Sequence, residues 1–489
     1  MDSAGHRLDE PSPTLVAALR GADQLGVLAH WERLDAAARE RLLAQVTAID
    51  WGLVADLTRR VRRGHLAPPA GDTSFDLASA ESPPCRPLRG ADPTVAARGR
   101  EALAAGAVGA ILVAGGQGTR LGCTGPKGLC AVGPLSQATL FDVLLGRLAA
   151  IGRRYGRGVP LAIMTSAATD DETRRFLASR QWCGLDPDDV FLFRQQDLPA
   201  FDAADGNILL AAPDRVALAP DGHGGMLSTL ADVGGLEWFG RRGVATVASF
   251  QVDNPLALPL DPEFLGAHLD AAAEFTLQVI RKREPAERVG VIATSGGVTR
   301  VVEYSDLPAT AAAERLADGR LRFHAGSIAV HAFALEFLAH CAARGDALPL
   351  HAARKVVPFV DADGRHHAPR APNAVKFERF IFDILPLARR VCVVEVEPGE
   401  GFAPLKNPSG AAADTPEHVR EALIARDRAI LAAAGVTVDE GVVVELDAAT
   451  ILDADDVTLA LPPGTRISES AVIRADPMAP RGTGGGEFR

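Results

Sequence analysis

The chain has 489 residues, of which 47% are hydrophobic and 23% charged, so it can bury two or three hydrophobic cores. A formal net charge of −11 without a long basic run argues against a general nucleic-acid-binding surface. No apolar stretch reaches the roughly 18 residues needed to cross a bilayer, and residues 1–13 lack the layout of a secretion signal. We therefore expect a cytoplasmic globular protein without nucleic-acid or membrane partners.

The cysteines predict neither a metal centre nor a disulfide framework. None of the six forms a C-x-x-C pair with another, and they are scattered along the chain. We expect structural free thiols at all six positions, which are Cys85, Cys123, Cys130, Cys183, Cys341 and Cys392.

A helical N-terminal region is expected over residues 1–100. Apolar side chains recur every three or four positions in 13–63, the spacing of amphipathic helices. A Pro- and Ser-rich connector, 66–96, ends that pattern and leads to another helix near 94–105.

The next domain, expected over 101–405, alternates short β-rich apolar runs with helical patterns. Strands are expected at 108–113, 160–165, 190–193 and 243–250, and helices near 137–151, 170–180 and 226–239. This alternation is typical of α/β proteins whose parallel strands are buried on both faces. Three more closely spaced runs predict antiparallel strands at 275–282, 288–294 and 298–304.

The end of the chain has a different pattern. Residues 415–434 have helical spacing, whereas 441–473 contain short apolar runs broken by Asp, Pro and Gly. We expect a small β-rich C-terminal domain over 406–475 and a disordered Gly-rich tail over 476–489.

The most informative segment is LVAGGQGTRLGCTGPKG, residues 112–128, directly after the first expected strand. Its glycines, among them Gly115 and Gly116, let backbone N–H groups approach an anion and tolerate positive φ. A purely structural turn is the alternative, but Arg120 and Lys127 favour phosphate binding. The segment matches neither the P-loop nor the G-x-G-x-x-G dinucleotide pattern, which argues against an NAD-dependent dehydrogenase.

Lysine is rare in this chain, because five of the 51 basic residues are lysines and the rest are arginines. An ammonium and a guanidinium are not interchangeable in a crowded phosphate site, although either serves on a surface. The retained lysines are therefore candidates for functional positions, with chance retention as the alternative; they are Lys127, Lys282, Lys355, Lys376 and Lys406.

Four other clusters combine turn residues with single polar groups. FRQQDLPAF (193–201) offers two neighbouring amides suited to the edge of a base. APDGHGGM (219–226) is a second Gly-rich turn that leads into a helix, and PLKNPSG (404–410) contains Lys406. QVDNPL (251–256) places Asp253 after an expected strand, where its carboxylate could hold Mg²⁺ or simply begin a turn.

These segments, in this order, resemble the uridylyltransferases that make UDP-sugars, and most closely the UDP-N-acetylhexosamine pyrophosphorylases. Five further segments extend the resemblance over roughly residues 25–425, and all five lysines fall inside the matching segments. These five are KREPAERVGV (282–291), VVEYSDL (301–307), FHAGSIAVHAF (323–333), LPLHAARKVVP (348–358) and PNAVKFERFIFD (372–383).

The resemblance implies a Rossmann-like nucleotidyltransferase core with a mixed, mostly parallel sheet. It implies that uridine and its phosphates meet Leu112, Gly115, Gly116, Gln195, Gly222 and His223. It implies that the sugar phosphate meets Gly290, Glu303, Ser327 and Lys376. It further implies that Asp253 carries Mg²⁺ and that the catalytic groups are Arg120, Lys127 and Lys406.

Two positions depart from the N-acetylhexosamine pattern. His223 stands where Asn is usual and resembles the GHG of UDP-glucose pyrophosphorylases, and Ser327 stands where a second Asn is usual. A lost amide removes hydrogen bonds that discriminate between sugars. The expected substrates are UTP and N-acetylglucosamine 1-phosphate, with glucose 1-phosphate or a broader range of sugars as the alternative.

The expected reaction is in-line attack of the sugar 1-phosphate on the α-phosphorus of UTP, which releases pyrophosphate. A non-catalytic UDP-sugar-binding protein is the alternative of another class. Retention of Arg120, Lys127, Asp253 and Lys406 argues against that alternative. The sequence does not specify an oligomeric state.

Overall fold

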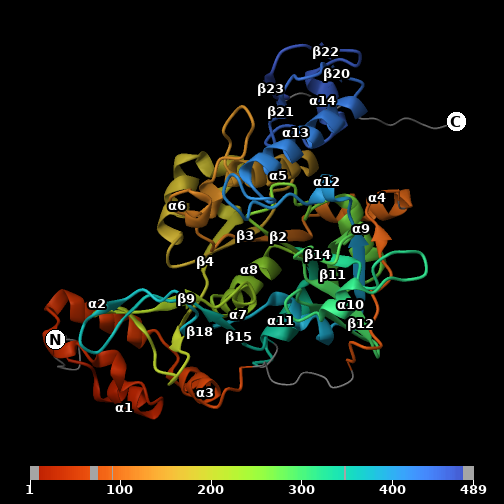
Figure 1. The fold of residues 1–489 in the computed structure, drawn as a ribbon. Coiled ribbons are helices and arrows are strands. Elements are labelled where there is room, and N and C mark those ends of the chain that lie inside the picture. The colour runs from red at the N-terminus through yellow and green to blue at the C-terminus, as the bar shows by residue number, and fades with distance from the viewer. Residues whose placement is uncertain (1–9, 67–74, 91, 346–347, 477–489) are drawn as a thin grey trace. The chain divides into compact units, whose positions relative to one another are not determined.

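The computed structural model describes residues 10–66, 75–90, 92–345 and 348–476, and the chain forms two units that are interleaved in sequence (Figure 1). Apart from Asp476, the predicted disordered tail lies outside the described residues. No helix in the described part of the chain is long and apolar enough to span a membrane. The first unit comprises 1–73, 195–226 and 346–383, and the second comprises 74–194, 227–345 and 384–489.

The second unit is built on a ten-stranded mixed sheet with the order β1-β19-β11-β14-β10-β2-β3-β4, which the hairpin β12–β13 joins at β14. Neighbours in this order are parallel, except that β14 is antiparallel to both β11 and β10. The predicted α/β class is therefore confirmed. The strands are β1 (Arg86–Pro87), β2 (Val108–Val113), β3 (Leu161–Thr165), β4 (Val190–Arg194), β10 (Thr246–Gln251), β11 (Phe275–Arg281), β12 (Val291–Ser295), β13 (Val298–Val302), β14 (Ala325–Ala334) and β19 (Val391–Glu395).

The expected antiparallel strands at 275–282, 288–294 and 298–304 are present, but the first of them also has a parallel neighbour. The run 275–282 forms β11, which is antiparallel to β14 and parallel to β19, and β12 and β13 form an antiparallel pair. Its partner β19 lies more than a hundred residues later in the chain, so local spacing along the sequence could not identify it. The strand β1 was also missed, because two residues are too short to show a periodic pattern.

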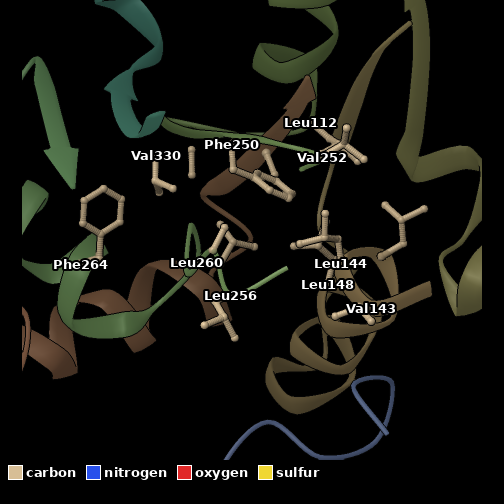
Figure 2. Packing of buried hydrophobic residues seen from close by; sticks show 14 of the residues in the cluster. Leu112, Val143, Leu144, Leu148, Phe250, Val252, Leu256, Leu260, Phe264 and Val330 are labelled. Carbon is tan, nitrogen blue, oxygen red and sulfur yellow. The ribbon is translucent and has the colours of Figure 1, made fainter. Parts of the chain in front are cut away.

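Helices cover both faces of this sheet. Figure 2 shows Leu144 and Leu148 of α5 and Phe264 of α9 packing beneath Phe250 and Val330 of the sheet. On the opposite face, a Cβ at Gly109 of β2 would lie 2.6 Å from the ring of Phe239 in α8, so that glycine permits close helix–strand packing. The helices are α4 (Pro93–Ala104), α5 (Leu140–Tyr155), α6 (Asp170–Ser179), α7 (Gly225–Asp232), α8 (Gly235–Arg241), α9 (Pro262–Asp270), α10 (Ala309–Ala313), α11 (Leu335–Ala342) and α12 (Pro398–Gly401).

The single helix expected over 226–239 is two helices, α7 and α8. Gly234 stands between them with φ of 77°, a left-handed conformation that ends a helix. The prediction followed the apolar spacing alone and so overlooked the adjacent pair Gly234 and Gly235, which is a turn signal.

The C-terminal part of the second unit has its own small hydrophobic core, which includes Leu431, Val444, Ile451 and Val457. Four short strands form two parallel pairs, β20–β22 and β21–β23. The β-rich expectation for 441–473 overlooked the helix α14. The elements are α13 (Pro416–Ala433), β20 (Thr437–Val438), β21 (Val444–Leu446), α14 (Ala454–Ala460), β22 (Arg466–Ile467) and β23 (Ala471–Ile473).

The first unit contains the expected N-terminal helices, α1 (Pro13–Gly21), α2 (Ala36–Thr47) and α3 (Trp51–Arg62). Leu19, Leu42 and Leu57 from these helices are fully buried in one cluster with Phe201 and Phe377. Its strands are β5 (Asp197–Pro199), β6 (Phe201–Asp202), β7 (Leu210–Ala212), β8 (Arg215–Val216), β9 (Leu218–Pro220), β15 (His351–Lys355), β16 (Phe359–Val360), β17 (His366–His367) and β18 (Ala374–Glu378).

Candidate active site

The Gly-rich loop follows β2 at the carboxyl edge of the sheet and closes on itself. Lys127 donates its backbone N–H to Gly116 at 2.9 Å, and Gly118 donates to Gly125 at 2.8 Å. The hydroxyl of Ser166, directly after β3, donates to the carbonyl of Gly115 at 2.8 Å. These bonds return Lys127 to the end of β2, so the loop presents its amides and its lysine together.

The glycines of the loop serve different purposes from those expected. Positive φ occurs at Gly122 (77°) and Gly125 (82°), whereas Gly115 and Gly116 do not have it. At Gly118 a side chain is excluded by contact, because a Cβ there would lie 2.8 Å from Cβ of Cys123. The turn therefore depends on its later glycines.

The expectation of six free thiols is wrong for one pair. Cys123 and Cys130 form a disulfide with their Cα atoms 5.8 Å apart, and Lys127 lies in the ring that this bond closes. A spacing of seven residues carries no recognisable signal, so the bond was not predictable from the sequence. The other cysteines are free as expected, namely Cys85, Cys183, Cys341 and Cys392.

Lys127 and Asp253 meet at the ends of two adjacent parallel strands. Val113 at the end of β2 is paired with Gln251 at the end of β10, so the segments that follow emerge side by side. Nζ of Lys127 lies 3.4 Å from Oδ2 of Asp253, and the two side chains are 20% and 13% exposed. Two groups that are 126 residues apart in sequence thus share one site.

The surroundings of Asp253 fit a metal that is bound mainly by the substrate. The side chain of Asn254 is already occupied, since its amide donates to Gly401 and its oxygen accepts from Ala403 and Leu256. Within the described ranges, no group of three or more His, Cys, Asp or Glu side chains gathers to hold a metal. Mg²⁺ commonly takes one or two carboxylates and completes its shell with phosphates and water, so the single carboxylate of Asp253 fits it.

The two other predicted catalytic cations lie in the same unit. Leu405 donates its backbone N–H to the carbonyl of Asp253 at 2.8 Å, which places the backbone of Lys406 beside that residue. Nζ of Lys406 lies 5.6 Å from the ring centroid of Phe402. Arg120 is exposed on the loop, and no ion pair in the described part of the chain involves it.

Three residues predicted to contact the sugar phosphate lie together in the second unit. Ser327 donates its backbone N–H to the carbonyl of Gly290 at 2.8 Å. A Cβ at Gly290 would lie 3.2 Å from Oε1 of Glu303, so that carboxylate lies against the glycine. The group stands where β14 begins and where β12 joins it at Gly326.

The remaining predicted residues, Gln195, Gly222, His223 and Lys376, lie in the first unit. Gln195 is only 5% exposed, and its amide makes no hydrogen bond within the described residues. Gly222 has φ of 87°, and a Cβ there would lie 2.4 Å from the carbonyl oxygen of Arg379, so only glycine fits. Lys376 lies in β18 and is half-buried.

The sequence did not reveal the ion pair that fixes the Gly222 turn. Arg379 donates from Nη1 to Oδ2 of the fully buried Asp221 at 2.9 Å, and their backbones are joined at 2.6 Å. Burial raises the pKa of Asp221 to about 6, although Arg379 opposes this shift. Asp221 is part of the quoted APDGHGG segment, but nothing in the sequence links it to a partner 158 residues away.

His223 is held by packing as well as by one hydrogen bond. Its ring lies 5.4 Å from Phe380 and 5.5 Å from Phe382, and Nδ1 accepts from the backbone N–H of Ile381 at 3.3 Å. Burial lowers the pKa of His223 to about 4, so the ring is neutral at pH 7. A neutral ring that accepts at Nδ1 carries its proton on Nε2.

Comparison with known proteins relates this arrangement to a family. Residues 94–412 match the family model described as UTP–glucose-1-phosphate uridylyltransferase. The human (Homo sapiens) UDP-N-acetylhexosamine pyrophosphorylase-like protein 1 is 37% identical over 423 residues, which cover 83% of each chain. The UDP-N-acetylglucosamine pyrophosphorylase of Saccharomyces cerevisiae is 35% identical over 356 residues, which cover 71% of this chain and 74% of the yeast protein.

A solved structure agrees with these matches. The crystal structure of the uridine diphosphate N-acetylglucosamine pyrophosphorylase from Trypanosoma brucei, in complex with inhibitor, has a TM-score of 0.77 and 26% identity. The similarity covers 96% of this chain and 99% of that one. Together with the match over residues 94–412, these similarities show that the chain belongs to the UTP–glucose-1-phosphate uridylyltransferase family.

Proposed function

We propose that this protein joins UTP to N-acetylglucosamine 1-phosphate, forming UDP-N-acetylglucosamine and pyrophosphate. The observation that carries the proposal is the meeting of Lys127 and Asp253 at the ends of β2 and β10, beside a loop of backbone amides. A nucleoside triphosphate is suited by this combination of an ammonium, a carboxylate and a Gly-rich turn at the carboxyl edge of an α/β sheet. The substrates named for the relatives supply the identity of the sugar.

In the proposed reaction, an oxygen of the sugar 1-phosphate forms a bond to the α-phosphorus of UTP. The bond from that phosphorus to the α,β-bridging oxygen breaks, and its electron pair leaves with pyrophosphate. The attacking oxygen is already anionic, so the reaction needs neither a nucleophilic side chain nor a covalent intermediate. The barrier comes from repulsion between two anions and from charge that grows on the leaving oxygen.

The charged side chains of the chain would lower that barrier. Lys127 and Arg120 would neutralise the pyrophosphate as it leaves, and Lys406 would orient the attacking phosphate. Asp253 would be the protein ligand of Mg²⁺, since among the residues that the structure describes its carboxylate is bonded to the ammonium of Lys127 alone. When bound, Mg²⁺ supplies positive charge that screens the phosphate oxygens.

The proposed preference for N-acetylglucosamine 1-phosphate comes from the relatives, but two residues of this chain differ from the pattern of N-acetylhexosamine enzymes. His223 and Ser327 replace the amides that are usual in N-acetylhexosamine enzymes, and His223 resembles the UDP-glucose enzymes at this position. An imidazole Nε2–H still donates one hydrogen bond, whereas an amide both donates and accepts. We therefore keep UDP-glucose formation as the second candidate.

The test is an assay of purified protein with UTP, Mg²⁺ and one sugar 1-phosphate at a time, with pyrophosphate and UDP-sugar measured separately. The panel contains N-acetylglucosamine, N-acetylgalactosamine and glucose 1-phosphates. The proposal predicts that N-acetylglucosamine 1-phosphate has the highest kcat/KM. Preference for glucose 1-phosphate would favour the second candidate, and UDP-sugar binding without pyrophosphate release would leave a non-catalytic binding protein.

A further inference from the structure

Lys282 is a buried lysine whose ammonium is paired with no other described residue. It directly follows β11, and its backbone N–H donates to the carbonyl of His324 at 2.8 Å. The residue is only 2% exposed, and no hydrogen bond or ion pair among the described residues satisfies its ammonium. Burying an unpaired charge is costly, so its retention here calls for a ligand or for some other compensation.

Glu287 does not provide that compensation. Glu287 raises the pKa of Lys282, but burial outweighs it and lowers the pKa overall. Oε1 of Glu287 instead accepts the backbone N–H groups of Arg283 at 3.0 Å and Glu284 at 2.8 Å. Arg281 shows the contrast, because it is half exposed and pairs with Glu395 at 2.6 Å.

The sheet places Lys282 on the edge that bears Asp253. Leu277 of β11 and Ser249 of β10 both pair with His331 of β14. Because both strands are antiparallel to β14, which lies between them, β11 and β10 point in the same direction. Lys282 comes five residues after Leu277, and Asp253 comes four residues after Ser249. Both residues therefore follow parallel strands at the carboxyl edge of the sheet, where ligands of α/β proteins gather.

The sugar-phosphate cluster lies on the same edge. Ala325, at the start of β14, pairs with Arg281, and Ser327 follows two residues later. Ser327 is bonded to Gly290, which Glu303 contacts. We propose that Lys282 is a further substrate-binding residue of this enzyme, whose ammonium contacts the phosphate of the sugar 1-phosphate. This inference rests on the proposed uridylyltransferase function.

The first test replaces Lys282 by Met, which keeps the length of the side chain and removes its charge. A lost charge-assisted contact should raise KM for N-acetylglucosamine 1-phosphate at least about tenfold, while KM for UTP stays within about twofold. Arg281→Met is the matched control, since that neighbouring cation is exposed and should change neither KM. Equal shifts in both KM values, unchanged kinetics, or the same shift in the control would overturn the inference.

A second test uses the unaltered protein and needs no turnover. Pyridoxal 5′-phosphate condenses with a deprotonated lysine amine, losing water, and borohydride then reduces the imine to a stable adduct. Peptide mapping should locate the adduct at Lys282, and UDP-N-acetylglucosamine or inorganic phosphate should prevent it. Absence of the adduct, or no protection by either anion, would overturn the inference. An inactive protein whose Lys282 is labelled and protected by phosphate would instead count against the proposed function alone.

Discussion

Nζ of Lys127 lies 3.4 Å from Oδ2 of Asp253, so the cation expected to meet phosphates and the carboxylate expected to bind Mg²⁺ form an ion pair with each other in this structure. Each side chain neutralises the other until a substrate arrives. A nucleotide that carries its own cation would replace both halves of the pair, because its phosphates attract Lys127 and its metal attracts Asp253. The pair would therefore compete with a metal-bound nucleotide for both side chains.

Replacing Lys127 by Ala should lower kcat by about a hundredfold, by analogy with the loss of one donor to a transition state. The reason is that growing charge on the leaving pyrophosphate loses its nearest ammonium. Lys355→Ala is the control, because Lys355 is an exposed lysine to which no role is assigned. Steady-state release of pyrophosphate measures the effect, and near-normal turnover in the Lys127 variant would contradict the role.

Asp253→Asn should raise the Mg²⁺ concentration needed for half-maximal activity at least about tenfold, since a neutral amide is a weaker ligand for a hard cation. Lys127→Ala should move this requirement in the opposite direction, because it frees the carboxylate from its ion pair. Titration of activity with Mg²⁺ in both variants checks the prediction. Shifts in the same direction would show that the pair does not compete with the metal.

The continuous apolar runs gave reliable predictions because both faces of the sheet are covered. Val108–Val113 and Leu161–Thr165 are strands within one residue of their expected bounds. Strand pairing was harder to predict, since one of the two neighbours of β11 is β19, far along the chain. A short strand such as Arg86–Pro87 has no pattern of its own and exists only because β19 is beside it.

The site was predictable where chemistry and chain order coincide. The cations of the loop and Asp253 could be named because both follow strands and ligands gather at such ends. Asp221 and Arg379 were missed because an ion pair between distant segments leaves no trace in either one. Lys282 was noted only for its rarity, and its burial is a property of the folded chain.

The stability of the fold should depend on pH through His223. Burial lowers its pKa to about 4, below the ordinary value near 6.5, so the unfolded chain takes up a proton more readily than the folded one. The stabilisation from the neutral ring is complete above about pH 6.5 and is lost as the pH falls toward 4.

His223→Asn removes the titrating group and keeps a polar side chain at this position. As the pH falls from 6.5 to 4, the unfolding free energy of the natural protein should therefore decrease more than that of this variant. Denaturant titrations at several pH values measure this difference. A difference that is independent of pH would mean that His223 titrates alike in both states.

The disulfide between Cys123 and Cys130 should influence binding of UTP, because Lys127 lies in the ring that it closes. A constrained loop loses less conformational entropy when a ligand orders it. Reduction by dithiothreitol, whose two thiols become a cyclic disulfide as the protein gains two thiols, should therefore raise KM for UTP. Cys123→Ser should have the same effect without reductant, whereas Cys183→Ser should not, since Cys183 is free.

Thiol titration of the denatured protein tests for the disulfide without an activity assay. Protein purified without reductant should show four free thiols, and reduction should raise the number to six. Six free thiols before reduction would show that the native protein lacks the disulfide. An unchanged KM for UTP after reduction would show that the disulfide does not constrain nucleotide binding.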